Sequence, residues 1–128
     1  MERHAVIVAG FGFRTGAAPS SLRDAFAMAC ADCDSAGVTA LAAPADKVAP
    51  LASLAAELSL PVIAVAPEAL ERVSTTTISP ASIAARRTGS VAEAAALAAA
   101  GPGARLLAAR RVSSDRMATC AIAQRIST

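Results

Sequence analysis

The chain has 128 residues, of which 55% are hydrophobic and 17% charged, and its formal net charge is +2 at pH 7. This length suits one domain with its own core, and the hydrophobic content argues against intrinsic disorder. The near-neutral charge and the lack of Trp and Tyr argue against a nucleic-acid partner, and three cysteines argue against a secreted disulfide framework. We therefore expect a single domain over residues 1–128.

The first predicted elements are a buried strand over residues 4–9 and a glycine-rich loop over 10–16. The apolar run of the strand is too short for a signal peptide or a membrane span, so we expect a cytoplasmic protein without membrane contact. A helix is expected over 21–35, where Ser21 and Asp24 have the spacing of a capping box. Its apolar face consists of Leu22, Ala25, Phe26, Ala29, Cys30 and Cys33.

A second strand is predicted over residues 38–42, and a helix over 46–59 follows it. Asp46 can cap this helix, and Pro50 lies in its first turn, where proline is tolerated. A third strand follows over 60–65, and one or two helical turns over 67–72.

The C-terminal part begins with a Ser- and Thr-rich loop over residues 73–89. A capping box at Ser90–Glu93 predicts a helix over 91–100. Two strands over 105–111 and 117–126 then form an antiparallel hairpin. The alternation of strands and helices predicts an α/β fold, namely a three-layer α/β/α sandwich with a mixed, mostly parallel sheet and a C-terminal antiparallel hairpin.

The loop after the first strand is the first candidate binding site, because open sheets of this kind bind ligands beyond the carboxyl ends of their strands. Gly10, Gly12 and Gly16 have neither the dinucleotide-binding nor the Walker spacing. The glycines either form a tight turn or present backbone N–H groups to an anion. Arg14 and Thr15 favour anion binding, since they add side-chain donors.

Two further basic segments are expected at the same edge of the sheet. Lys47, the only lysine, lies at the start of the predicted helix, where a cation is unfavourable for the helix dipole and therefore suggests carboxylate binding. A hydroxyl-rich strip over 74–79, which includes Ser79, precedes Arg86 and suits a ligand with many carboxylates. The alternatives are a solvated surface lysine and a flexible polar loop.

No catalytic or metal-binding constellation is evident in the sequence. The Cys30–Cys33 motif has no second pair, so we interpret its thiols as buried apolar groups and expect neither a metal nor a cofactor. Asp46 and Glu93 are the candidates for a general acid or base, although capping roles also explain them. The catalytic residues therefore stay unknown.

Three segments together resemble the CobE family of cobalamin (vitamin B12) biosynthesis, which also forms the C-terminal domain of CbiG. They are Gly10–Gly16, Ala45–Lys47 and Gly89–Leu97, of which the last, with its Val-Ala-Glu-Ala-Ala-Ala-Leu run, is the most specific. Thr119–Ala123 also fits the family pattern. In their order along the sequence, the matching segments span essentially the whole chain.

The resemblance implies a role in corrin-ring synthesis. Our first hypothesis is a binding or accessory factor for a precorrin. The alternatives are a lactone-opening hydrolase or lyase that releases acetaldehyde, as in CbiG, and a generic anion- or nucleotide-binding module. The expected partners are a precorrin or related tetrapyrrole intermediate, other enzymes of the pathway, and a second copy of the chain docked through alanine-rich helix faces.

Overall fold

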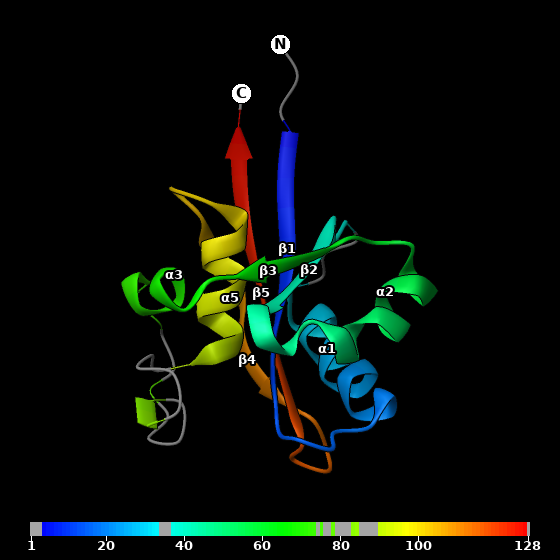
Figure 1. The fold of residues 1–128 in the computed structure, drawn as a ribbon. Coiled ribbons are helices and arrows are strands. Elements are labelled where there is room, and N and C mark those ends of the chain that lie inside the picture. Colours follow the sequence, from blue (N-terminus) through cyan, green and yellow to red (C-terminus); the bar gives the residue numbers. More distant parts are fainter. Residues whose placement is uncertain are drawn as a thin grey trace.

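The computed structural model describes residues 4–33, 37–73, 75, 78, 83–84 and 90–127, with backbone alone for His4 and Ser127. A five-stranded sheet with the order β3-β2-β1-β5-β4 forms its centre (Figure 1). The strands are β1 (His4–Phe13), β2 (Ala40–Pro44), β3 (Val62–Val65), β4 (Arg105–Val112) and β5 (Ala118–Ser127). β1, β2 and β3 are parallel, whereas β5 is antiparallel to both β1 and β4. The mixed sheet and the C-terminal hairpin are therefore confirmed.

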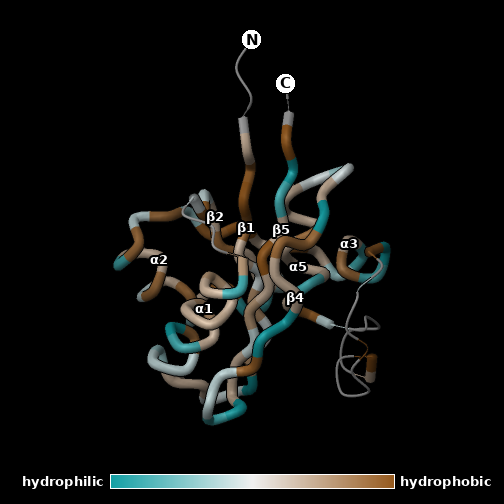
Figure 2. The backbone as a smooth tube through the Cα atoms, turned by 180° about the vertical axis from the view of Figure 1, so that it is seen from behind, coloured by the Kyte–Doolittle hydropathy of each residue, from teal (hydrophilic) through white to brown (hydrophobic). Residues whose placement is uncertain are grey.

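Helices cover both faces of this sheet (Figure 1). α1 (Pro19–Cys33) and α2 (Ala52–Leu58) lie on one face, and α3 (Pro67–Arg72) and α5 (Val91–Ala100) on the other. Each face has its own cluster of buried apolar side chains, which confirms the three-layer arrangement. Hydrophobic stretches follow the central β1, whereas hydrophilic positions gather at the periphery (Figure 2). Within the described residues, no helix is long and apolar enough to cross a membrane.

Successive residues of β1 alternate between the two cores. Ile7 and Phe11 are buried on the α1 side, and Val8 is buried on the α5 side. Gly10 lies directly beneath α5, where an added Cβ would be 2.2 Å from the Ala92 carbonyl oxygen and 2.4 Å from the Ala96 nitrogen. The glycine thus lets an alanine-rich helix pack with its backbone against the sheet.

The glycine-rich segment differs from its prediction as a loop, because residues 10–13 continue β1. Gly10–Phe13 pair with Ala118–Ala121 of β5, which supplies backbone hydrogen-bond partners along the whole segment. The sequence could not reveal this pairing, since the two strands lie more than a hundred residues apart.

The start of α1 also differs from its prediction. The helix begins at Pro19, and Ser21 and Asp24 do not form a capping box. The Ser21 hydroxyl instead donates to Asp115, and the Asp24 carboxylate accepts the Ser114 N–H at 2.7 Å. Both side chains therefore connect α1 to the turn between β4 and β5.

The helix predicted over 46–59 is shorter than expected. Ala45–Lys47 and Ala49–Leu51 form separate 3₁₀ turns, and α2 begins only at Ala52. Proline at position 50 explains the break, because it lacks an N–H and disfavours α conformation in the residue before it. The predicted capping role of Asp46 is wrong, since neither turn nor α2 has a side-chain cap.

Candidate functional site: a basic cavity at the ends of β1 and β2

A cavity of about 350 Å³ lies where the parallel strands β1 and β2 end. Its lining comes from the end of β1 and the following turn, from the end of β2 and the following 3₁₀ turn, and from the first residue of α5. The lining residues are Gly12, Phe13, Arg14, Thr15, Pro44, Lys47 and Val91. The cavity therefore occupies the edge of the sheet at which the sequence predicts a ligand.

Lys47 reaches this cavity from the 3₁₀ turn after β2. Its Nζ lies 5.3 Å from the centroid of the Phe13 ring, within the range of a cation–π interaction. Phe13 is the last residue of β1, so the pairing of β1 with β2 brings the two side chains together. The aromatic ring thus holds the ammonium group at the cavity without neutralising its charge.

Arg14 and Thr15 follow Phe13 in a turn whose backbone is fixed. The Arg14 N–H donates to the Met117 carbonyl at 2.9 Å, and its carbonyl accepts the Ala17 N–H at 3.0 Å. Both side chains are exposed. Among the described residues, no carboxylate forms an ion pair with Arg14 or Lys47, so both cations remain available to a ligand.

Gly12 and Val91 line the cavity on the α5 side, and Thr119 packs behind Gly12. A Cβ on Gly12 would lie 2.9 Å from Thr119 Oγ1 and 3.2 Å from Val91 Cβ, so a larger residue would displace these side chains. The Thr119 hydroxyl donates to the Gly12 carbonyl at 3.0 Å. Ser90 caps the helix by accepting the Glu93 N–H, and the positive end of the α5 dipole adds to the charge of the two cations.

The structure brings together four of the predicted ligand-binding residues, Gly12, Arg14, Thr15 and Lys47. Gly10 lies beneath α5, and Gly16, with φ +87°, does not line the cavity. Ser79 and Arg86 lie outside the described residues. The dipole argument for Lys47 is wrong, because this residue ends a 3₁₀ turn instead of starting the α-helix.

Sequence reasoning missed Phe13, Pro44 and Val91 as parts of the cavity. The rarity of aromatic residues was the available signal for Phe13, one of three phenylalanines in the chain. Pro44 ends β2, so the rule that ligands bind beyond strand ends is its sequence signal, whereas no such signal places Val91 beside Phe13.

The two candidate acid–base residues lie away from the cavity lining. Glu93 is fully buried, and its Oε2 accepts the Arg110 N–H of β4 at 2.9 Å. The Ser90 half of the predicted capping box is therefore present, because the Ser90 hydroxyl accepts the Glu93 N–H. The Glu93 carboxylate bonds to the backbone of β4. Asp46 is exposed, one position before Lys47.

The cysteines pack as apolar groups. Cys30 and Cys33 are half-buried against the α1-side core, and Cys120 is buried within it. Burial raises the pKa of the Cys30 thiol and raises that of Cys120 well above its ordinary value. Neutral thiols are poor nucleophiles and poor metal ligands.

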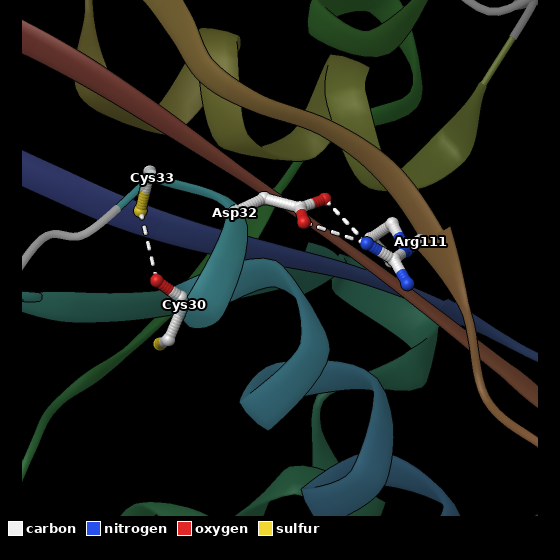
Figure 3. Close-up of polar contacts among 4 residues, drawn as sticks. All are labelled: Cys30, Asp32, Cys33 and Arg111. Carbon is white, nitrogen blue, oxygen red and sulfur yellow. Dashed lines mark hydrogen bonds and ion pairs between the residues drawn. The ribbon is translucent and has the colours of Figure 1, made fainter.

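The surroundings of the cysteine motif fit this packing role. The Cys33 thiol donates to the Cys30 carbonyl, while Asp32 points away from both sulfurs and pairs with Arg111 at 2.6 Å (Figure 3). In the described parts of the chain, no three His, Cys, Asp or Glu side chains are placed to hold a metal ion.

The fold and the cavity define a three-layer α/β domain with a basic cavity at the carboxyl ends of parallel strands. The chain belongs to the family described as cobalamin synthesis G C-terminus, whose model matches residues 7–123. No curated protein matches the sequence.

Solved structures support this assignment. CobE, a protein from the cobalamin (vitamin B12) biosynthetic pathway, is 31% identical with a TM-score of 0.85, over 94% of this chain and 91% of CobE. The cobalamin biosynthesis protein ChiG from Agrobacterium tumefaciens is 42% identical with a TM-score of 0.68, over 92% of this chain and 97% of ChiG. The chain is therefore a cobalamin biosynthesis protein of the CobE/CbiG type.

A more distant structure shares the fold within a longer protein. A cobalamin biosynthesis protein G homolog from Sulfolobus solfataricus is 21% identical with a TM-score of 0.68. The match covers 93% of this chain and 36% of that protein.

Proposed function

We propose that this protein binds a precorrin through its peripheral carboxylates and acts as an accessory factor in corrin synthesis. The observation that carries the proposal is the basic cavity, in which Arg14 and Lys47 meet without an acidic partner among the described residues. A precorrin is a macrocycle rimmed by acetate and propionate groups. Cationic side chains at a sheet edge suit such a ligand, since charge-assisted hydrogen bonds to carboxylates are strong.

The composition favours binding by charge over stacking on the ring. The chain has no Trp or Tyr, and Phe13 is the one aromatic residue that lines the cavity. Because the Phe13 ring already contacts Lys47, it supports the cation. The planar guanidinium of Arg14 can bind a carboxylate through two parallel hydrogen bonds.

A lactone-opening hydrolase is the competing function, and the placement of the acids disfavours it. Such an enzyme needs a general base within hydrogen-bond reach of the reacting atoms. None of the described lining residues is a carboxylate or an imidazole. Glu93 already accepts a hydrogen bond from β4, and it is buried in the interior.

The test is a titration of the purified protein with late precorrin intermediates, followed by visible absorbance and by acetaldehyde release. We expect a saturable absorbance change without acetaldehyde. K47M and R14Q should each weaken binding about tenfold, because each removes a charge-assisted contact. R105Q is the matched control, since Arg105 is exposed at the start of β4 and pairs in register with Gln124, far from the cavity.

Two outcomes would contradict the proposal. Absence of binding to every intermediate would remove the binding role. Acetaldehyde release at a catalytic rate would instead establish an enzyme, and E93Q would then show whether Glu93 serves as its base. Loss of turnover in E93Q with unchanged stability would assign that role to Glu93.

A further inference from the structure

We propose that the cavity takes a single carboxylate arm of the ligand, and that Lys47 selects a carboxylate over the corresponding amide. This inference rests on the proposed function, since it names which part of the precorrin enters the site. It concerns recognition of one arm and can be tested without the macrocycle.

The size of the cavity carries the first step. Its volume of about 350 Å³ lies near the lower end of the range of about 300–1,000 Å³ that is typical of pockets enclosing drug-sized ligands. A tetrapyrrole with its substituents is considerably larger than such ligands. One acetate or propionate arm fits inside, and the ring then remains outside the cavity.

The walls leave little room for adjustment. Pro44 is fully buried at the end of β2, and a Cβ added to Gly12 would press on the side chains of Thr119 and Val91. Both belong to paired strands, so the sheet fixes the backbone on these two sides of the cavity.

The chemistry of the lining matches an arm with a charged end. Phe13, Pro44 and Val91 are apolar and suit the methylene groups of an acetate or propionate. Lys47 is half-buried and held over the Phe13 ring, so it meets the carboxylate inside the cavity. Exposed Arg14 lies further out and remains available to a second carboxylate on the rim of the ring.

Selection of carboxylate over amide follows from the available hydrogen-bonding groups. An ammonium group donates hydrogen bonds and accepts none, so it attracts a carboxylate and leaves the NH₂ of an amide without an acceptor. The half-buried position of Lys47 strengthens this difference, because charge interactions are weaker in open water. An arm that has been amidated should therefore bind much less well.

The experiment uses propionate and its neutral isostere propionamide as probes. Each is titrated into the ¹⁵N-labelled full chain while amide chemical shifts are recorded by NMR. We expect propionate to shift the amides of Gly12, Lys47 and Val91 with millimolar affinity, and propionamide to leave them unchanged. K47M should weaken propionate binding about tenfold, whereas R105Q should not change it. The spectrum of each variant also shows that the variant is folded.

Each remaining outcome would overturn either a named part of the inference or the proposed function on which it rests. Equal shifts with both probes, or full affinity in K47M, would remove the selection by Lys47. No shift at the cavity amides would remove the arm-binding role, even if precorrins bind elsewhere on the protein. Propionate binding without precorrin binding would instead keep the carboxylate cavity and contradict the proposed function.

Discussion

At the scale of single residues, Gly10 shows how one missing side chain sets the distance between a helix and the sheet. An added Cβ would meet the backbone of Ala92 and Ala96 at 2.2–2.4 Å. Backbone atoms cannot rotate away, so α5 would have to shift. We expect G10A to lower the free energy of unfolding by about 3 kcal/mol, at the upper end of overpacking effects.

The measurement is urea unfolding followed by far-UV circular dichroism, since the chain lacks Trp and Tyr for fluorescence. G37A is the control, because among the residues that the structure describes, a Cβ at Gly37 would meet only the Ile7 Cδ1 at 3.6 Å, an ordinary contact. Equal unfolding midpoints for the two variants would show that α5 adjusts easily to a larger residue.

Sequence reasoning and the structure point to the same candidate site where residue type and chain position agree. Arg14, Thr15 and Lys47 were predicted because they follow strands and carry hydrogen-bond donors, and all three line the cavity. Gly10 was assigned to the anion loop, although close packing explains its lack of a side chain. A sequence alone does not distinguish a glycine that admits a ligand from one that admits a helix.

At the scale of elements, the carboxylate of Asp115 holds the turn between β4 and β5 together and connects it to α1, beside the contact of Asp24 with Ser114. Asp115 accepts the hydroxyls of Ser21 and Ser113, together with the Met117 N–H at 3.1 Å. These hydrogen bonds lower the pKa of Asp115 from its ordinary value of 3.8, with Ser113 as the largest cause. The ionised carboxylate therefore stabilises the folded state.

This arrangement predicts a pH-dependent effect of D115N. Because the pKa of Asp115 is lower in the folded state, its contribution is fully present above about pH 5 and is lost as the pH falls through 3.8 and below. D115N should unfold at lower urea concentration than the wild type at pH 7, and the difference should shrink in acid. Urea midpoints at pH 7 and pH 3 measure it.

E68Q provides the control for D115N, since Glu68 is exposed on α3 and its removal takes away the same charge. Its midpoint should stay near that of the wild type at pH 7. A destabilisation by D115N that persists unchanged at pH 3 would contradict the role assigned to the ionised form.

Helices were predicted best where the periodic pattern of hydrophobic residues extends over many residues. The apolar face predicted for α1 packs on the core, and α5 has the predicted bounds. The helix after β2 was predicted too long, because proline divides it into short turns. In the short α2 that remains, Leu54 and Ala55 are buried and Ala52 is exposed.

At the scale of the whole molecule, the order of strands was beyond prediction from the sequence. Alternating strands and helices indicated parallel pairing, and the last two strands indicated a hairpin. That β5 lies between β1 and β4 depends on the ten-residue pairing of the chain's two ends, His4–Phe13 with Ala118–Ser127. This pairing also lengthens β1 to Phe13 and so carries the aromatic ring to the cavity.

The reaction rate of the Cys120 thiol reports on the opening of this sheet. It lies on β5 opposite Phe11 and is fully buried in the core on the α1 side. Burial excludes reagents and raises the pKa of its thiol well above the ordinary value, so reaction requires the sheet and helix to separate. We expect native Cys120 to react with a thiol reagent at least about a thousandfold more slowly than in urea-unfolded protein.

Mass spectrometry after timed labelling measures the labelling rate of each of the three cysteines separately. Half-buried Cys30 and Cys33 serve as internal references, because local fraying of α1 can expose them without global unfolding. The labelling rate of Cys120 should rise with urea in parallel with the unfolded fraction from circular dichroism. If Cys120 reacts as fast as Cys30 in native buffer, the contact between β5 and α1 opens locally, and the two faces of the sheet do not unfold as one unit.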